Sequence, residues 1–201
     1  MKTSYIVIIV IVAILLIGGC GGCSSYNSIV SLDQNAQSKW GTVQTDYQRR
    51  ADLVPNLVAT VKGVANFEKS TLVDVTNARA KATSIQVDPS KLTPETIQKF
   101  QSAQGELSGA LSRLLVASER YPELKATENF SGLQAQLEGT ENRINASRRD
   151  YNEAVQAYNT RIRTFPDAIG AKIFYGAKPK VPFEAAAAAQ NAPTVNFGNS
   201  N

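Results

Sequence analysis

The N-terminal part of the chain is an uninterrupted run of 15 apolar or small residues, Tyr5 to Gly19, that leads directly into Cys20. Its strongly apolar part, Tyr5 to Ile17, has 13 residues, a length typical of a signal-peptide core and short for a transmembrane helix. Counting on to Cys23 gives 19 residues, just enough at about 1.5 Å each to cross about 30 Å of hydrocarbon. A segment without any polar face does not suit the core helix of a soluble domain. The sequence therefore predicts that residues 1–25 attach the chain to a membrane or send it across one.

Two forms of this attachment are open. Ile17-Gly18-Gly19-Cys20 resembles a bacterial lipobox, in which case Cys20 would become the lipidated first residue of a lipoprotein. Alternatively, the segment stays as an uncleaved anchor, and Cys20 and Cys23 are small apolar residues within it. The flanking charges, Lys2 and Lys39, do not decide which side of the membrane the rest of the chain faces. In either form we expect membrane lipid to be a partner of this segment.

The composition argues against several classes of function. The chain has 201 residues, no histidine and a formal net charge of +4. Both cysteines lie in the N-terminal segment, which excludes a disulfide scaffold or a thiolate metal site from the remainder. Without histidine the chain lacks the commonest general base near neutral pH and the commonest zinc ligand. Because the basic residues form no block, we expect no nucleic-acid partner, and we also predict no cofactor, no metal and no catalytic residue.

Residues 26–165 read as helix almost throughout. Apolar residues recur at intervals of three and four in two successive stripes, Ile29 to Tyr47 and Leu57 to Ile85. Between the stripes, Asp52 suits an N-cap, and Pro55 is tolerated in the first turn of the helix that follows. This pattern predicts a tight break between two antiparallel helices. One long helix kinked at Pro55 is the alternative.

Two further helices follow the turn chemistry of Asp88-Pro89-Ser90. Thr93 is expected to cap the third helix, with Pro94 as its first residue and Pro122 at its end. The fourth helix has apolar residues seven apart from Phe130 to Phe165, which predicts a continuous seam against its neighbours. The predicted fold is all-α: an elongated antiparallel four-helix bundle preceded by an N-terminal membrane segment.

The chain thus divides into four parts. Residues 1–25 are the membrane anchor or lipoprotein signal, and residues 26–165 form the helical bundle. Residues 166–183 carry short apolar patches among Gly, Pro and Lys, and we expect them to lie on the bundle as a C-terminal strap. Residues 184–201 are rich in Ala and Asn and are predicted to be a flexible tail.

Two groups of polar residues are structural or interaction candidates. Arg49 and Arg50 precede the expected break, where either could pair with Asp52, and Asn56 lies just beyond it. We favour a structural clasp over a ligand site here. The second group is two Tyr-Asn pairs seven residues apart on the fourth helix, Tyr151-Asn152 and Tyr158-Asn159. The structural interpretation is that the rings are core knobs and the amides bond neighbouring helices; a functional interaction face is the alternative.

Acidic residues also occur in pairs three or four positions apart, which places them on one helix face. The pairs are Glu119/Glu123, Glu138/Glu141 and Asp150/Glu153. A weak divalent-ion site is conceivable on these faces. Without histidine, however, they do not resemble the carboxylate and Glu-x-x-His set of di-iron bundles.

Several of these motifs carry a family resemblance. The run Tyr47-Gln48-Arg49-Arg50-Ala51-Asp52-Leu53-Val54-Pro55-Asn56-Leu57-Val58 closely resembles the LemA family, as do the two Tyr-Asn pairs and the closing Pro182-Phe183-Glu184. The resemblance extends from Tyr26 to Phe197. It implies a bacterial protein with an N-terminal membrane segment, an all-helical domain and no established catalytic activity. Members often carry a histidine where this chain has Phe67, which weakens a proton-transfer or metal role there.

We therefore expect a non-enzymatic, membrane-anchored scaffold or adaptor of the bacterial cell envelope that binds one or more envelope proteins. The alternative is a divalent-ion-dependent enzyme or enzyme accessory that uses the acidic faces of the bundle. The sequence identifies neither the partner protein nor the oligomeric state.

Overall fold

The computed structural model describes residues 2–64, 67–173 and 175–183, and every regular element within these ranges is a helix. The elements in chain order are α1 (Lys2–Lys62), α2 (Lys69–Ser84), α3 (Pro94–Ser118), α4 (Pro122–Lys125), α5 (Glu128–Arg161) and α6 (Asp167–Ile173). The prediction of an all-α fold is confirmed for this part of the chain. The division into four helices is not confirmed, because the described residues form six, of which α4 and α6 have only 4 and 7 residues. The expected flexible tail, 184–201, lies outside the described residues.

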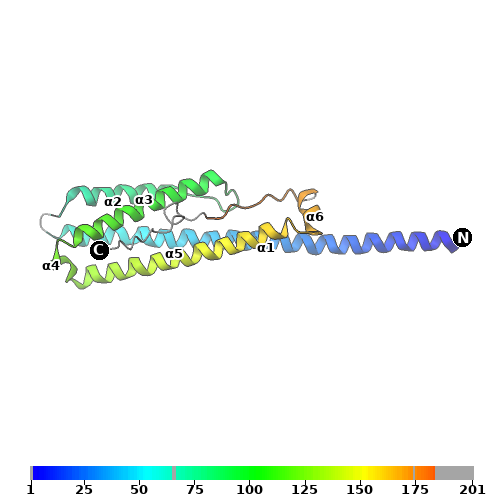
Figure 1. Cartoon of the computed structure of the whole chain (residues 1–201), viewed down its shortest axis with the longest axis horizontal. Coiled ribbons are helices and arrows are strands. Elements are labelled where there is room, and N and C mark those ends of the chain that lie inside the picture. The colour runs from blue at the N-terminus through cyan, green and yellow to red at the C-terminus, as the bar shows by residue number, and fades with distance from the viewer. Residues whose placement is uncertain (1, 65–66, 174, 184–201) are drawn as a thin grey trace, which may run out of the picture.

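The helix α1 forms the long axis of the molecule (Figure 1). It has 61 residues and is therefore about 90 Å long at 1.5 Å per residue. Its C-terminal half lies among the other helices, with α2 and α3 on one side and α5 on the other, while its N-terminal end projects beyond them (Figure 1). The outcome is a rod with a helical bundle at one end.

Three clusters of buried side chains follow one another along this axis. The first, nearest the turn between α1 and α2, joins residues of α1, α2, α3 and α5, among them Leu57, Leu107 and Phe130. The second is rich in aromatic residues and centres on Trp40. The third is small and joins Ile29, Tyr158, Ile162 and Ala171. Three separate clusters therefore line α1; the first is mainly aliphatic, the second mainly aromatic and the third mixed.

The expected break at Pro55 does not occur, because α1 continues through this proline to Lys62. Proline has no N–H, so the carbonyl of the residue four positions earlier, Ala51, loses its helical donor. Arg79 of α2 replaces that donor: its Nε donates to the Ala51 carbonyl oxygen at 2.8 Å. Val54, Leu57 and their neighbours pack into the first cluster on this stretch. Tertiary packing and the Arg79 hydrogen bond therefore hold the helix where local preference would end it.

The role expected for Asp52 is consequently wrong. Asp52 lies in the interior of α1, exposed, and its carboxylate accepts a hydrogen bond from Gln48 Nε2 at 2.7 Å. The first interruption comes after Lys62, where Val64 N donates to the Val61 carbonyl in a turn.

The other helix boundaries follow the local signals more closely. Thr93 caps α3 as predicted, because its Oγ1 accepts from the Thr96 amide at 3.2 Å and Pro94 is the first helical residue. Pro122 begins the short α4 rather than ending α3. The heptad line of α5 ends early: Phe165 lies beyond the helix with 77% of its surface exposed.

Across the residues that the structure describes, none of the helices combines the length and apolar character that a membrane-crossing segment needs. Cys20, the lipidation candidate, lies in the backbone of α1, but its side chain is outside the described part of the chain. Its lipidation stays a prediction.

Candidate functional site

After α6 the chain turns back along the bundle as an extended segment, residues 177–183 (Figure 1). The turn uses Gly176, whose φ of +57° is a left-handed conformation that glycine adopts without strain. Next to it, the Ala177 amide donates to the Ala171 carbonyl at 3.0 Å and the Tyr175 amide to the Gly170 carbonyl at 3.2 Å. These contacts send the extended segment antiparallel to α5.

Two asparagines of α5 hold the main chain of this segment. Asn159 Nδ2 donates to the Lys180 carbonyl at 2.8 Å, and its Oδ1 accepts from the Lys180 amide at 2.8 Å. Asn152 repeats the arrangement on Phe183, with distances of 3.1 Å to the carbonyl and 2.8 Å from the amide. Each side-chain amide therefore satisfies both polar groups of one backbone residue. The expectation that these amides bond neighbouring helices is wrong.

The tyrosines of the two Tyr-Asn pairs are buried in the bundle. Tyr151 is fully buried, and its hydroxyl donates to the Val181 carbonyl at 2.9 Å. Burial raises the pKa of this phenol well above its usual range. Tyr158 is buried in the third cluster, and burial, followed by the negative charge of Asp33, raises its pKa. Both rings are thus core residues, and the Tyr151 hydroxyl also contributes to the seat of the extended segment.

Phe183 anchors the segment in the aromatic cluster. Its ring stacks on Trp40 with 5.3 Å between centroids and an interplanar angle of 17°, and it meets the Tyr151 ring edge-on at 5.4 Å. The guanidinium of Arg148 lies over the other side of the site, 5.0 Å from the Phe183 ring centroid. Such aromatic contacts stabilise a buried ring beyond its area burial. The sequence predicted a strap with short apolar patches over residues 166–183 but did not single out Phe183 as its anchor.

Lys180 supplies the second anchor. Its Nζ forms a salt bridge of 2.8 Å with Asp33 of α1 and lies 5.2 Å from the Tyr158 ring centroid. The side chains of Lys180 and Asp33 are only 14% and 28% exposed, so solvent screens this pair less than a surface pair. The extended segment is therefore held between α1 and α5 by one aromatic and one basic side chain.

Arg50, the other candidate that the structure brings into a cluster, links three helices. Its Nη2 donates to the Gln104 carbonyl and side-chain oxygens at 3.0 and 2.9 Å, and its Nη1 to Ser108 Oγ at 2.6 Å. It also forms a 3.1 Å salt bridge with Glu141 of α5. Arg50 is 3% exposed, whereas Arg49, Asp52 and Asn56 are exposed on α1. The clasp is thus made across the bundle by Arg50, and the expected pair with Asp52 is wrong.

Tyr47 lies beside this clasp, with the Arg50 guanidinium 5.0 Å from its ring centroid. Burial raises the pKa of the Tyr47 phenol, and the positive charges of Arg148 and Arg50 oppose that rise. The surroundings of Tyr47 therefore favour its neutral phenol beside the Arg50 guanidinium. We assign this contact to the stability of the fold.

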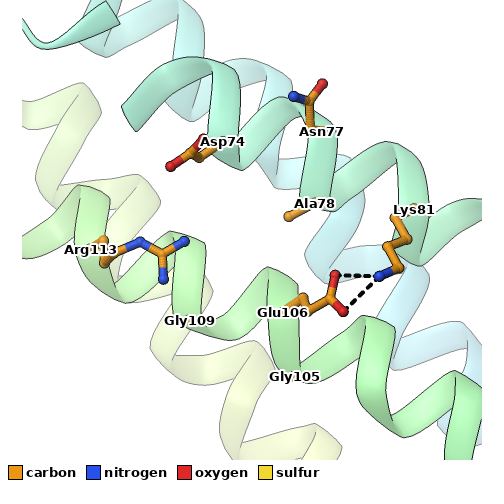
Figure 2. Close-up of a pocket in the computed structure, with 8 residues that line it drawn as sticks. All are labelled: Asp74, Asn77, Ala78, Lys81, Gly105, Glu106, Gly109 and Arg113. Carbon is orange, nitrogen blue, oxygen red and sulfur yellow. Dashed lines mark hydrogen bonds and ion pairs between the residues drawn. The ribbon is translucent and has the colours of Figure 1, made fainter. Parts of the chain in front are cut away.

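A second concave surface lies between α2 and α3, a groove of about 590 Å³ (Figure 2). Lys81 and Glu106 form an ion pair across it, with Lys81 Nζ 2.7 Å from both carboxylate oxygens. Figure 2 shows Asp74 and Asn77 on the α2 wall and Arg113 on the α3 wall. Gly105 and Gly109 leave the α3 side shallow. The charges of this groove are mixed, and its walls carry no group aligned for one reaction.

One carboxylate of each acidic pair, the faces on which a weak divalent-ion site is conceivable, forms an ion pair with a basic side chain. Glu119 pairs with Lys125 at 2.8 Å, and Asp150 pairs with Lys39 at 2.8 Å. Within the described ranges, no group of three or more Cys, Asp or Glu side chains lies close enough to hold a metal ion.

Comparison with known proteins identifies the family. The model of the LemA family matches residues 39–197. Over 139 residues the chain is 31% identical to Protein LemA of Metamycoplasma hominis, covering 69% of this chain and 60% of that protein. Over 162 residues it is 26% identical to magnetosome protein MamQ 2 of Paramagnetospirillum magneticum and 25% identical to magnetosome protein MamQ of Magnetospirillum gryphiswaldense, covering 70% of this chain and 58% of each relative.

The chain spans about three fifths of the length of these curated relatives. The matched range of the family model includes the block around Arg50, both Tyr-Asn pairs and the extended segment that they hold. It covers well over half of the residues, and the resemblance read from the sequence is confirmed. The chain belongs to the LemA family.

Proposed function

We propose that this protein is a non-enzymatic scaffold or adaptor of the bacterial cell envelope, anchored to a membrane by its N-terminal segment. The observation that carries the proposal is the construction of α1. One end of this helix bears large apolar side chains that are 47–66% exposed, and the other end is the central element of the bundle core. The exposed residues are Tyr5, Ile6, Ile8, Ile9 and Val12.

The exposed apolar end needs an apolar environment. Burying one such side chain releases about 1.5–3 kcal/mol, so five of them favour a lipid or protein environment over water by several kcal/mol. The printed sequence extends this apolar character to Gly19. These features support a membrane as the environment, with either an acylated Cys20 or an uncleaved segment as the anchor.

The bundle itself supports a binding role rather than a catalytic one. Several of its buried polar groups, among them the Arg50 Nη atoms and the Tyr151 hydroxyl, bond other elements of the fold. The chain has no histidine, and one carboxylate of each acidic pair (Glu119, Glu141 and Asp150) forms an ion pair with lysine or arginine. An adaptor needs a stable domain that presents a surface at a fixed place, and the unbroken α1 supplies this.

Cell fractionation with mass spectrometry of the N-terminal peptide tests the anchor. We expect the protein in the membrane fraction, with either a diacyl or triacyl Cys20 or an intact Met1 start. A soluble mature protein that begins after Cys23 would overturn the proposal. Crosslinking in intact cells tests the adaptor role, because an adaptor should give discrete crosslinked species that depend on the domain.

A further inference from the structure

The extended segment 177–183 is recognised mainly through its backbone. Asn159 and Asn152 each bond both the N–H and the C=O of a single residue, Lys180 and Phe183 respectively. Such bonds are available from any residue with an amide N–H. The same two asparagines could therefore hold any chain that presents its backbone with the same spacing.

That spacing is the spacing of a polyproline II helix. Lys180 and Phe183 are three residues apart and both face α5, whereas a β-strand turns alternate residues to opposite sides. A polyproline II helix repeats every three residues and advances about 9.3 Å in that distance. Asn152 and Asn159 are seven residues apart on α5, about 10.5 Å. The two repeats agree to about 1 Å. A β-strand also advances about 10 Å over three residues, so the common facing of Lys180 and Phe183, and not the distance alone, favours a polyproline II chain.

The sequence of the segment agrees with this conformation. Pro179 and Pro182 immediately precede the two residues that the asparagines hold, and proline fixes φ near the polyproline II value. Both prolines are exposed, while Phe183 is buried. The groove beneath is lined by the aromatic rings of Trp40 and Tyr151. These rings contact Phe183 and the prolines are exposed, so the backbone bonds and the aromatic side chain carry the recognition, while the prolines favour the extended conformation.

Two side chains of the segment add specificity. Lys180 reaches the carboxylate of Asp33, and Phe183 fills the space between Trp40 and Tyr151. The groove thus selects a basic residue after the first proline and an aromatic residue after the second.

The contacts of segment 177–183 allow it to leave the groove while the rest of the bundle stays folded. Phe183 is the one buried side chain among residues 177–183; Val181 and Lys180 are partly buried, and the other contacts are the Lys180–Asp33 salt bridge and hydrogen bonds to the backbone of the segment. Hollows of about 530 and 410 Å³ border it, the first lined by Tyr158 and Lys180 among others and the second by Asn152, Asn159 and Pro182 among others. Segments with few buried apolar contacts open at lower free energy than the core.

We propose that the groove between α1 and α5 is a binding site for a polyproline II segment of a partner polypeptide with the pattern Pro-Lys-x-Pro-Phe, and that residues 179–183 occupy it in the unbound protein. This inference rests on the proposed adaptor function and names the chemical class of its partner. Asn145 lies one further heptad along α5 and is exposed. It extends the row of amides for a longer occupant.

The test uses the full chain in detergent micelles and a fluorescent peptide Ala-Lys-Pro-Lys-Val-Pro-Phe, with binding followed by anisotropy. The double variant Lys180→Ala, Phe183→Ala removes both anchors of the internal segment and should bind the peptide at least about tenfold more tightly than the unmodified chain. Adding Asn152→Ala and Asn159→Ala should weaken that binding at least about tenfold.

Matched controls separate groove binding from general effects. Asn142→Ala changes an exposed amide of α5 that lies roughly 80° round the helix from Asn152, and it should leave the affinity unchanged. A peptide with Glu in place of the second Lys should bind more weakly because it would face Asp33. No binding of the parent peptide to the folded double variant would overturn the proposal. So would a dimer in which two copies of the chain exchange their own segments.

Hydrogen exchange on the unmodified chain covers the case in which the double variant does not fold. The amides of Lys180 and Phe183 should exchange at least about a hundredfold faster than those of core residues in α5. Exchange at the rate of global unfolding would show that the segment never leaves the groove and would overturn the proposal. Neither result affects membrane fractionation, so this inference can fail while the anchor proposal stands.

Discussion

Replacing Arg79 with methionine should destabilise the protein by an amount that depends on the residue at position 55. In the native chain, Arg79 Nε is the donor to the Ala51 carbonyl, which Pro55 leaves without a helical partner. Methionine keeps the apolar stem of the side chain but not the donor. A hydrogen bond from a charged group contributes about 1.5–3 kcal/mol, and we expect a loss of that size.

The same substitution should cost much less when Pro55→Ala is already present. Alanine restores an N–H at position 55, which can donate to the Ala51 carbonyl as in an ordinary α-helix. Arg79→Met should then cost less than about 1 kcal/mol, which gives a coupling free energy of about 1–2 kcal/mol.

Thermal unfolding of the full chain in micelles, followed by circular dichroism at the helical band, measures all four members of the cycle. At about 2–4 °C per kcal/mol for a chain of this size, Arg79→Met should lower Tm by roughly 3–12 °C in the native background. Arg49→Met, on the exposed face of α1, is the matched control and should change stability by less than about 0.5 kcal/mol. Equal losses from Arg79→Met in both backgrounds would refute the reasoning.

Two further predictions concern buried polar groups. Arg50→Ala should destabilise the protein by about 3–5 kcal/mol in urea unfolding, because it leaves buried acceptors unpaired. Glu141→Gln should cost about 1 kcal/mol or less, because the Glu141 side chain is 49% exposed. Similar losses for the two variants would contradict the assigned geometry. Burial raises the pKa of Tyr151 and Tyr158, so above about pH 10 the folded protein binds more protons than the unfolded chain and stability should fall as pH rises. Tyr151→Phe should make this alkaline fall shallower, and an unchanged slope in pH-dependent urea unfolding would contradict that cause.

The helices were predictable from the sequence wherever their determinants are local. Thr93 and Pro94 specify the start of α3, and the spacing of seven from Phe130 to Tyr158 specifies the buried face of α5. These signals act within one or two turns, so sequence patterns capture them.

The sequence offered one long helix through Pro55 as an alternative but favoured a break there. The donor that makes the proline tolerable comes from Arg79, 28 residues away on another helix. Helix propensity accounts for the cost of a proline inside a helix, but it contains no information about a hydrogen-bond donor on another helix. The boundary was therefore misplaced to Asp52, a residue whose side chain suits a cap and whose surroundings give it no such role.

The two Tyr-Asn pairs show the same division at the candidate site. Their spacing identified them and correctly placed the rings in the core. The partners of the amides, Lys180 and Phe183, are 21 and 31 residues away in a stretch without periodicity. One signal could have linked the two stretches. Seven residues of helix α5 span nearly the same length as the three residues from Lys180 to Phe183, and this match appears only when both stretches are compared.

The unbroken course of α1 also has a mechanical consequence. In the proposed anchored state, a helix that passes from the apolar end into the core without a break would fix both the direction in which the domain faces and its height above the membrane. Removing one residue between Ser24 and Ile29 would turn every surface of the bundle by about 100° and lower it by about 1.5 Å, whereas removing seven would nearly restore the direction at about 10 Å less height. The length of α1 between Ser24 and Ile29 would therefore set both the height of the groove and the direction in which it faces.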